Sequence, residues 1–196
     1  HDALPICPTS QYLSSLLLAA PLAVEDTTID IPLLNERPYV DMTLHWLESE
    51  GIRYTNENYK RIHVPGGQRY APFTKRIPGD FSSATFFLCA AAASGSSLTV
   101  EGLDFDDPQG DKAVVGMLEA LGCSTEKTAT GITIHGGNLT GCDLDLNATP
   151  DALPALAVTA CFAEGTTRLL NVPQARLKET DRITVMREEL SKMGVA

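Results

Sequence analysis

The chain has 196 residues and carries 15 Lys and Arg against 25 Asp and Glu, which gives a formal net charge of -10 at pH 7. Hydrophobic residues make up 43% and charged residues 20%, a balance typical of a globular core and unlike that of a disordered chain. Nucleic acids and anionic membrane surfaces are bound through basic protein surfaces, so the acidic charge disfavours both as partners.

Membrane insertion, secretion and metal binding find no support in the residue pattern. The longest apolar stretches, 12–24 and 84–93, are shorter than the ~20 residues that span a bilayer. No secretion signal opens the chain. The five cysteines form no C-x-x-C pair, which favours reduced thiols and a cytoplasmic location. The four histidines lack metal-ligand spacing, so we expect no metal.

Three segments of the chain repeat one order of elements. Each begins with a small polar residue and an apolar helix, expected at 10–20, 82–93 and 151–163. A short strand follows, expected at 27–31, 97–100 and 166–170. A second helix then ends at Gly51, Gly122 or Gly194, which lie 71 and 72 residues apart. In the first two segments, strands at 62–64 and 132–134 lead into a Gly-Gly pair.

The helices differ in their expected burial. Ile183, Met186 and Leu190 form one apolar stripe, which predicts a half-buried helix. The first helix of each segment has almost no polar face, which predicts burial on nearly all sides. The fold class is therefore α/β (α+β type), with repeated βαβαββ units of about 70 residues. The proline-containing segment 72–80 is the best boundary, which divides the chain into 1–79 and 80–196.

The densest charged cluster is 176–182, which leads into the third amphipathic helix. The plainer interpretation is structural: Thr180 caps the helix, Asp181 favours its positive end, and the other residues form a solvated loop. The alternative is a site that gathers a base, an acid and ligands for an anion.

Two further places suit chemistry as well as helix capping. Asp151 follows Pro150 at the mouth of an otherwise uncharged helix, and a carboxylate there is a candidate general base. Thr9, Ser10 and Gln11 precede the first apolar helix, where free N–H groups, the helix dipole and side-chain donors suit a phosphate. Tyr39, at the start of the next helix, is either part of the core or lines a ligand site.

Several of these motifs together resemble the 5-enolpyruvylshikimate-3-phosphate (EPSP) synthase family. The run from Lys178 to Arg182 resembles its K-E-[ST]-D-R signature, and 9–12 resembles its S-S-Q-[FY] segment. The run 37–39 resembles its K-P-Y, and 79–84 resembles its G-D-x-S-S-A. Pro150-Asp151 and 162–167 also fit, and the motifs follow the family's order along the whole chain.

The resemblance implies an enolpyruvyl-transferase-like architecture of two domains, each made of three copies of a small α/β unit. Residues 1–79 would then be the last unit of one domain. Residues 80–196 would be the first unit and an incomplete second unit of the other. The chain would be a central fragment, incomplete at both ends and inactive alone, because the family's N-terminal Lys-Ser segment, phosphoenolpyruvate-binding Arg loop and C-terminal Arg and Lys are not in it.

The implied reaction transfers the enolpyruvyl group of phosphoenolpyruvate to the 5-hydroxyl of shikimate 3-phosphate, with release of phosphate and without a cofactor. Asp151 would be the base toward the 5-hydroxyl, and Glu179 would exchange a proton with the enolpyruvyl carbon. Lys178 would contact the shikimate hydroxyls and Arg182 the phosphoenolpyruvate anion. The implied shikimate 3-phosphate contacts are Thr9, Ser10, Gln11, Tyr39 and Gln174. The parent enzyme would be a monomer, and self-association of the isolated fragment is expected because its first unit exposes apolar surface.

Two positions depart from the family pattern. Glu36 stands where a serine often helps to bind the substrate's phosphate, and Gln174 stands where some members have Asn.

Two alternative functions stay open. One is a UDP-N-acetylglucosamine enolpyruvyl transferase, which usually carries a reactive loop Cys and lacks K-E-[ST]-D-R. The other is a non-catalytic α/β repeat binding module.

Overall fold

A computed structural model describes residues 10–195 of the chain. The chain divides into two compact units, His1–Arg76 (unit 1) and Ile77–Ala196 (unit 2), and each is described by itself. Gly79 is bonded within unit 2, because its backbone N–H donates to Gly102 O at 2.6 Å and its carbonyl accepts from Gln109 Nε2 at 3.1 Å.

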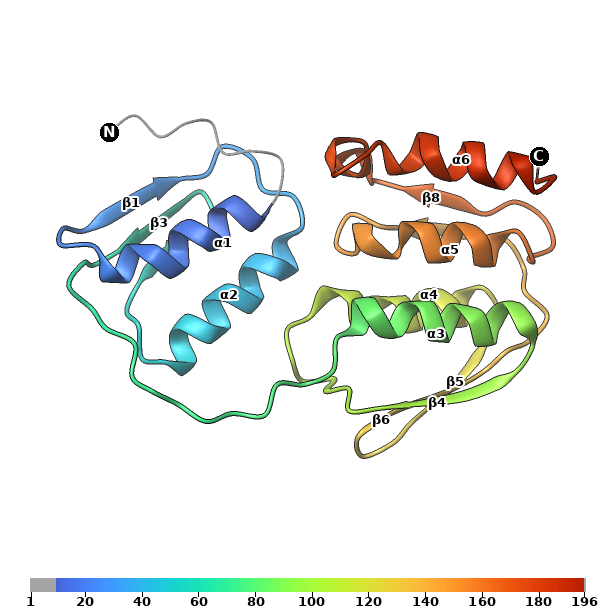
Figure 1. Ribbon diagram of the computed structural model, residues 1–196, viewed down its shortest axis with the longest axis horizontal. Coiled ribbons are helices and arrows are strands. Elements are labelled where there is room, and N and C mark those ends of the chain that lie inside the picture. Colours follow the sequence, from blue (N-terminus) through green and yellow to red (C-terminus); the bar gives the residue numbers. More distant parts are fainter. Residues whose placement is uncertain (1–9, 196) are drawn as a thin grey trace. The chain divides into compact units, whose positions relative to one another are not determined.

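Unit 1 contains two helices and one antiparallel sheet (Figure 1). The helices are α1 (Ser10–Ala19), extended by the 3-10 turn η1 (Ala20–Leu22), and α2 (Arg37–Ser49). The strands β1 (Thr27–Asp30), β2 (Thr55–Glu57) and β3 (Arg61–Val64) pair in the order β1-β3-β2. Apolar side chains from both helices and from the sheet form one core, with Leu17, Leu47 and Ile62 fully buried.

Unit 2 begins with the same arrangement. Helix α3 (Phe81–Ser94) is followed by β4 (Ser97–Glu101), η2 (Gly110–Lys112), α4 (Ala113–Ala120), β5 (Ser124–Lys127) and β6 (Gly131–His135), and the strands pair antiparallel in the order β4-β6-β5. A second part follows with β7 (Asp143–Asp145), η3 (Pro150–Ala152), α5 (Leu153–Ala160), β8 (Arg168–Leu170), η4 (Pro173–Leu177) and α6 (Arg182–Lys192). Strands β7 and β8 pair in parallel, and one hydrophobic core runs through both parts.

The expected repeat and the mixed helix-and-sheet fold are confirmed. The three glycines expected to end helices, Gly51, Gly122 and Gly194, have φ of 71°, 114° and 88°, a region that favours glycine. The two sheets also repeat a side-chain contact. His63 Nδ1 meets Thr28 Oγ1 at 3.1 Å in unit 1, and His135 Nδ1 meets Ser97 Oγ at 2.7 Å in unit 2.

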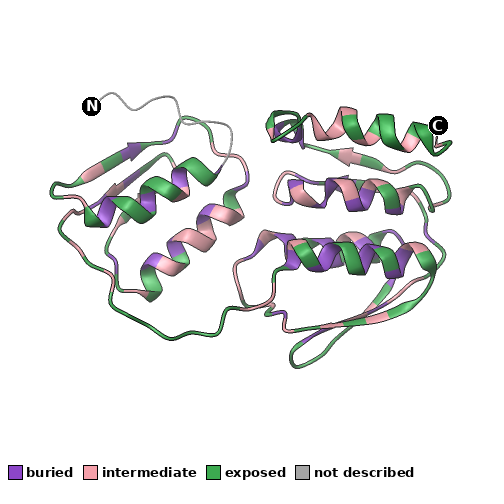
Figure 2. Ribbon diagram, viewed as in Figure 1, coloured by how far each residue is buried: buried purple, intermediate pink, exposed green. Residues whose placement is uncertain are grey.

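The expectation that the first helix of each segment is buried on nearly all sides is wrong. In α1, Leu16 and Leu18 are 45% and 46% exposed, and in α3 Phe86 and Phe87 are 56% and 63% exposed. Figure 2 shows both exposed and buried positions along each of these helices. Each helix buries one stripe against its own sheet and partner helix, and the described residues of its unit do not cover the opposite side. The expected exposure of apolar surface in unit 1 is therefore present.

Among residues 10–195, no helix is long and apolar enough to cross a membrane.

Candidate active site

A pocket of about 730 Å³ opens in unit 2. The start of α3, the turn η3, helix α5, and the loop and first turns of α6 contribute its walls. The lining residues are Ser82, Ser83, Phe86, Phe87, Asp151, Pro154, Glu179, Thr180, Arg182, Val185 and Met186. Three candidate residues from the sequence, Asp151, Glu179 and Arg182, therefore face one cavity.

Prolines position Asp151. Pro150 begins the 3-10 turn η3 and is buried, and Pro154 lies in the first turn of α5. Proline fixes φ near the helical value, so the chain turns sharply here and holds Asp151 at the helix mouth. The expected helix 151–163 is corrected in this respect, because Asp151 belongs to η3 and the α-helix begins at Leu153.

The charged side chains of the loop before α6 have two different roles. Asp181 caps the helix by accepting from the Thr184 backbone N–H at 3.1 Å, and Arg176 Nη1 donates to the same carboxylate at 2.8 Å. The cap is therefore Asp181, and the assignment of capping to Thr180 is wrong. This pair fixes the loop, while Glu179 and Arg182 face the pocket.

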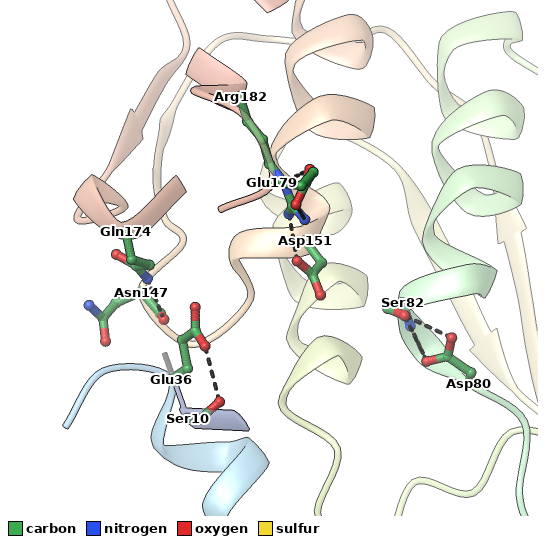
Figure 3. A network of polar contacts seen from close by, with 9 residues as sticks. All are labelled: Ser10, Glu36, Asp80, Ser82, Asn147, Asp151, Gln174, Glu179 and Arg182. Atoms are coloured by element: carbon green, nitrogen blue, oxygen red, sulfur yellow. Dashed lines mark hydrogen bonds and ion pairs between the residues drawn. The ribbon is translucent and has the colours of Figure 1, made fainter. Parts of the chain in front are cut away.

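Arg182 joins both carboxylates of the pocket (Figure 3). Its Nη1 donates to Asp151 Oδ1 at 2.6 Å. Its Nε and Nη2 donate to the two oxygens of Glu179 at 2.8 and 2.9 Å, which is a bidentate pair. The Arg182 side chain is 19% exposed, whereas those of Asp151 and Glu179 are 42% and 65% exposed. The guanidinium is thus the inner group and the carboxylates are the outer ones.

The contacts with Arg182 change the proton affinity of the site. The hydrogen bonds from Arg182 lower the pKa of Glu179 to about 2, and the nearby positive charge of Lys178 adds to this effect. The hydrogen bonds to Glu179, together with those to Asp151, raise the pKa of Arg182 above its already high value. Glu179 is therefore ionised throughout the neutral range in this state.

Gln174 lies buried on η4 and is not among the residues that line the pocket. Its Nε2 donates to Asn147 O at 3.2 Å, and Asn147 Nδ2 donates to Asn171 O at 3.2 Å, so amide contacts tie the loop before η3 to the segment around η4. The side-chain oxygen of Gln174 is buried and has no hydrogen-bond partner among the described residues. An acceptor in this position suits a ligand hydroxyl.

Sequence reasoning gave no site role to the start of α3. Asp80 caps this helix and accepts from the backbone N–H groups of Ser82 and Ser83, at 2.9 and 3.1 Å, and from both serine hydroxyls. Figure 3 shows the contacts between Asp80 and Ser82. The two serines, with Phe86 and Phe87, form one wall of the pocket. The G-D-x-S-S-A motif was the available signal, since it placed two hydroxyls at a helix start.

Lys178 is half-buried in the loop before α6 and is not among the residues that line the pocket. The other remaining candidates lie in unit 1. Thr9 falls outside the described residues. Ser10 is buried at the start of α1, and its hydroxyl donates to a carboxylate oxygen of Glu36 at 3.1 Å. Glu36 is 1% exposed, has φ of 58° and precedes α2, so this contact joins the starts of the two helices. Gln11 is exposed on α1, and Tyr39 is half-buried in the first turn of α2.

No group of three or more His, Cys, Asp or Glu residues that could hold a metal ion occurs within residues 10–195. The polar side chains that line the pocket in unit 2 are one guanidinium, two carboxylates and three hydroxyls. Such a set suits an anionic ligand and proton transfer to and from it.

Known proteins with similar sequences agree with the motifs. The family model of EPSP synthase (3-phosphoshikimate 1-carboxyvinyltransferase) matches residues 6–196. The 3-phosphoshikimate 1-carboxyvinyltransferase of Ruminiclostridium cellulolyticum is 56% identical over 188 residues, which cover 96% of this chain and 44% of that protein. The protein of the same name from Acetivibrio thermocellus is 56% identical over 186 residues, or 95% of this chain and 44% of its own length.

Solved structures show the same likeness. EPSP synthase from Acinetobacter baumannii aligns with a TM-score of 0.74 and 28% identity, over 96% of this chain and 44% of that one. The enolpyruvyl transferase NikO from Streptomyces tendae aligns with a TM-score of 0.61 and 18% identity, over 82% of this chain and 39% of its own, and shares the fold alone. The chain thus spans less than half the length of the relatives that it matches.

Proposed function

The chain belongs to the EPSP synthase family, and on this premise we propose that its pocket in unit 2 is part of the site that transfers an enolpyruvyl group from phosphoenolpyruvate to the 5-hydroxyl of shikimate 3-phosphate, with release of phosphate. The observation that carries the proposal is the meeting of Asp151, Glu179 and Arg182 in one pocket. The reaction needs a base, an acid and a positive group for an anion, and these three side chains supply one each.

The residue roles are part of the proposal. Asp151 takes the proton of the 5-hydroxyl, and Glu179 exchanges a proton with the enolpyruvyl carbon. Arg182 binds the phosphoenolpyruvate anion, and Lys178, half-buried beside Glu179, contacts the shikimate hydroxyls. No metal or organic cofactor takes part in these steps.

Shikimate 3-phosphate is the second proposed ligand. Its proposed contacts are Ser10, Gln11 and Tyr39 in unit 1, Gln174 in unit 2, and Thr9 outside the described residues. The buried, unpartnered amide oxygen of Gln174 supports a contact with a substrate hydroxyl. The Ser10 hydroxyl already donates to Glu36, so a substrate phosphate must compete for this donor.

The place of the chain in a larger protein is also a proposal. We assign unit 1 to the last repeat of one domain, and unit 2 to the first and second repeats of the other. The chain spans 44% of its relatives' length, which fits three of six repeats. We expect no turnover from this chain alone, and we propose that the whole protein acts as a cytoplasmic monomer without nucleic acid or membrane as partner.

A chimera tests the proposal. The matching region of the Acetivibrio thermocellus relative is replaced by this chain, and phosphate release is measured with phosphoenolpyruvate and shikimate 3-phosphate. We expect turnover that Asp151→Asn abolishes. The matched control is Asp143→Asn, which removes an exposed carboxylate paired with Arg168 and leaves the rate unchanged. A folded chimera without turnover, or one that is indifferent to Asp151→Asn, refutes the proposal.

A further inference from the structure

We propose that Arg182 acts as a clamp on Asp151 and Glu179, and that an anion that binds the Arg182 guanidinium displaces both carboxylates. This displacement lets Glu179 take up a proton. The inference rests on the proposed function of the pocket and adds to it a link between binding of the anionic substrate and the state of the acid. The anion is of the phosphate or carboxylate class, as both groups of phosphoenolpyruvate are.

The geometry of the guanidinium supplies the first step. All three of its nitrogens donate to carboxylates, Nη1 to Asp151 and Nε with Nη2 to Glu179. The fork of donors that holds Glu179 is the same fork that a phosphate or carboxylate ligand uses. An anion that binds Arg182 in this bidentate way must therefore take the place of Glu179.

Exposure makes the exchange feasible. The Glu179 side chain is 65% exposed and that of Asp151 is 42% exposed, so water can solvate either carboxylate once it leaves. Ion pairs with an exposed partner contribute little to stability. Arg182 itself is only 19% exposed, so the cation keeps its place while its partners change.

Helix α6 favours the incoming anion. Arg182 is the first residue of this 11-residue helix. The N-terminal end of a helix carries partial positive charge, which disfavours a cation and attracts an anion. A ligand anion at Arg182 therefore gains from the helix and from the guanidinium together, and Asp181 keeps its capping role through Thr184 and Arg176.

The last step connects anion binding at Arg182 with protonation of Glu179. While Arg182 holds both of its oxygens, the pKa of Glu179 is lowered, so its carboxylate takes up a proton less readily than a glutamate without this partner. The other charges near it are Lys178 in the same loop and Asp151 on η3. The wall from α3 contributes the uncharged Ser82 and Ser83. Loss of Arg182 as a partner raises the pKa of Glu179, Lys178 limits the rise, and the freed Asp151 increases it.

The test is a direct titration of Glu179 in the 196-residue chain. The carboxyl carbon is followed by 13C NMR from pH 7 to pH 2, with inorganic sulfate or with chloride at equal ionic strength, and Glu179→Gln identifies the signal. Phosphoenolpyruvate is the second probe. We expect either anion to shift the side-chain 15N signal of Arg182 and to raise the lowered pKa of Glu179 by up to about 0.7 unit, a ~5-fold gain in proton affinity, which is the upper size of an exposed ion pair.

Variants separate the clamp from general charge effects. Arg182→Gln raises the pKa of Glu179 without any anion and removes the response to sulfate. The matched control, Arg168→Gln, removes an exposed arginine paired with Asp143 in the same unit and changes neither result. If Arg182→Gln does not fold, Arg182→Lys keeps the charge, loses the fork and gives an intermediate rise.

Two results overturn the clamp. In one, the anion shifts Arg182 and the pKa of Glu179 does not move. In the other, neither anion reaches Arg182. The titration uses no shikimate 3-phosphate and no turnover, so its failure is distinct from failure of the proposed function. A clamp that responds as expected in a chain whose chimera is inactive refutes the proposed function alone.

Discussion

The start of α1 in unit 1 and the start of α6 in unit 2 are both proposed to meet an anion, and each already holds a partner from its own chain. At α1, the Ser10 hydroxyl donates to the carboxylate of Glu36, which is 1% exposed. At α6, Arg182 donates to the carboxylates of Asp151 and Glu179, which face solvent. The internal partner is therefore a buried carboxyl group in one place and an exposed pair of carboxylates in the other.

The difference decides how each place receives a ligand. At Arg182 the ligand replaces carboxylates that leave for water, so the guanidinium keeps an anionic partner throughout. At Ser10 the ligand arrives beside a buried carboxyl group that already accepts from the Ser10 hydroxyl and does not face solvent. We therefore expect unit 2 to accept a simple anion readily, and unit 1 to resist it while Glu36 holds the Ser10 hydroxyl.

The largest expected effect concerns Glu179, the proposed proton-exchanging residue of unit 2. In the chimera, Glu179→Gln removes the proton-exchanging group and keeps the side-chain shape. We expect the rate of phosphate release to fall by about 10²–10⁴-fold, with shikimate 3-phosphate binding retained. Stopped-time assays of phosphate and calorimetric binding measure the two quantities.

The control for this change is Glu188→Gln, an exposed glutamate on α6 outside the pocket, which leaves the rate unchanged. A Glu179→Gln chimera with the unaltered rate would show that Glu179 has no part in proton transfer.

A smaller effect is expected in unit 1. Glu36→Ser removes the buried carboxyl group that accepts from the Ser10 hydroxyl. We expect the Kd of the chimera for shikimate 3-phosphate to fall by about tenfold, which is the size of one hydrogen bond to a charged group. Calorimetry gives the Kd, and the matched control is Glu57→Ser on the exposed side of β2. Weaker binding by Glu36→Ser would mean that Glu36 supports the site instead of competing with the substrate.

The smallest effect is on stability. The pKa of Glu179 is lowered in the folded chain to about 2, whereas an unfolded glutamate titrates near ~4.3. The pair with Arg182 therefore stabilises the fold above about pH 4.3, and this contribution is lost as the pH falls toward 2. Because the pair is exposed, we expect well under ~1 kcal/mol.

Denaturant unfolding of the chain and of the Glu179→Gln variant measures how much the pair of Glu179 and Arg182 contributes to the free energy of unfolding. The difference in unfolding free energy should be present at pH 6 and should shrink at pH 3. A difference that is equal at both values contradicts the ion pair as its source.

The repeat itself could be predicted from local chemistry. Glycine at a helix end and alternation in short strands depend on nearby residues, and Gly51, Gly122 and Gly194 end their helices as expected. Burial of the first helices was wrong because an apolar sequence predicts that a helix has apolar faces but does not predict what covers them. Leu16 and Phe87 remain exposed in their units.

The site could be predicted only in part. Asp151 and Arg182 were each selected as candidates, but their contact joins residues 31 positions apart and depends on how η3 packs near α6. The contact between Ser10 and Glu36 also depends on packing, here between α1 and α2. The helix cap is Asp181 because its carboxylate accepts from the Thr184 N–H, and Arg176 adds a second contact to this carboxylate that no local pattern indicated.

One titration tests the contrast between the two units most directly. The 15N–1H spectrum of the uniformly labelled 196-residue chain is followed at pH 7 as inorganic sulfate replaces chloride at constant ionic strength. We expect saturable shifts of the Arg182 side chain and of the Thr184 amide, and no shift of the Ser10 and Gln11 amides until Glu36→Ser is introduced. Saturable shifts of the Ser10 amide signal with Glu36 in place, together with unchanged signals of the Arg182 side chain, would contradict the roles assigned to both units.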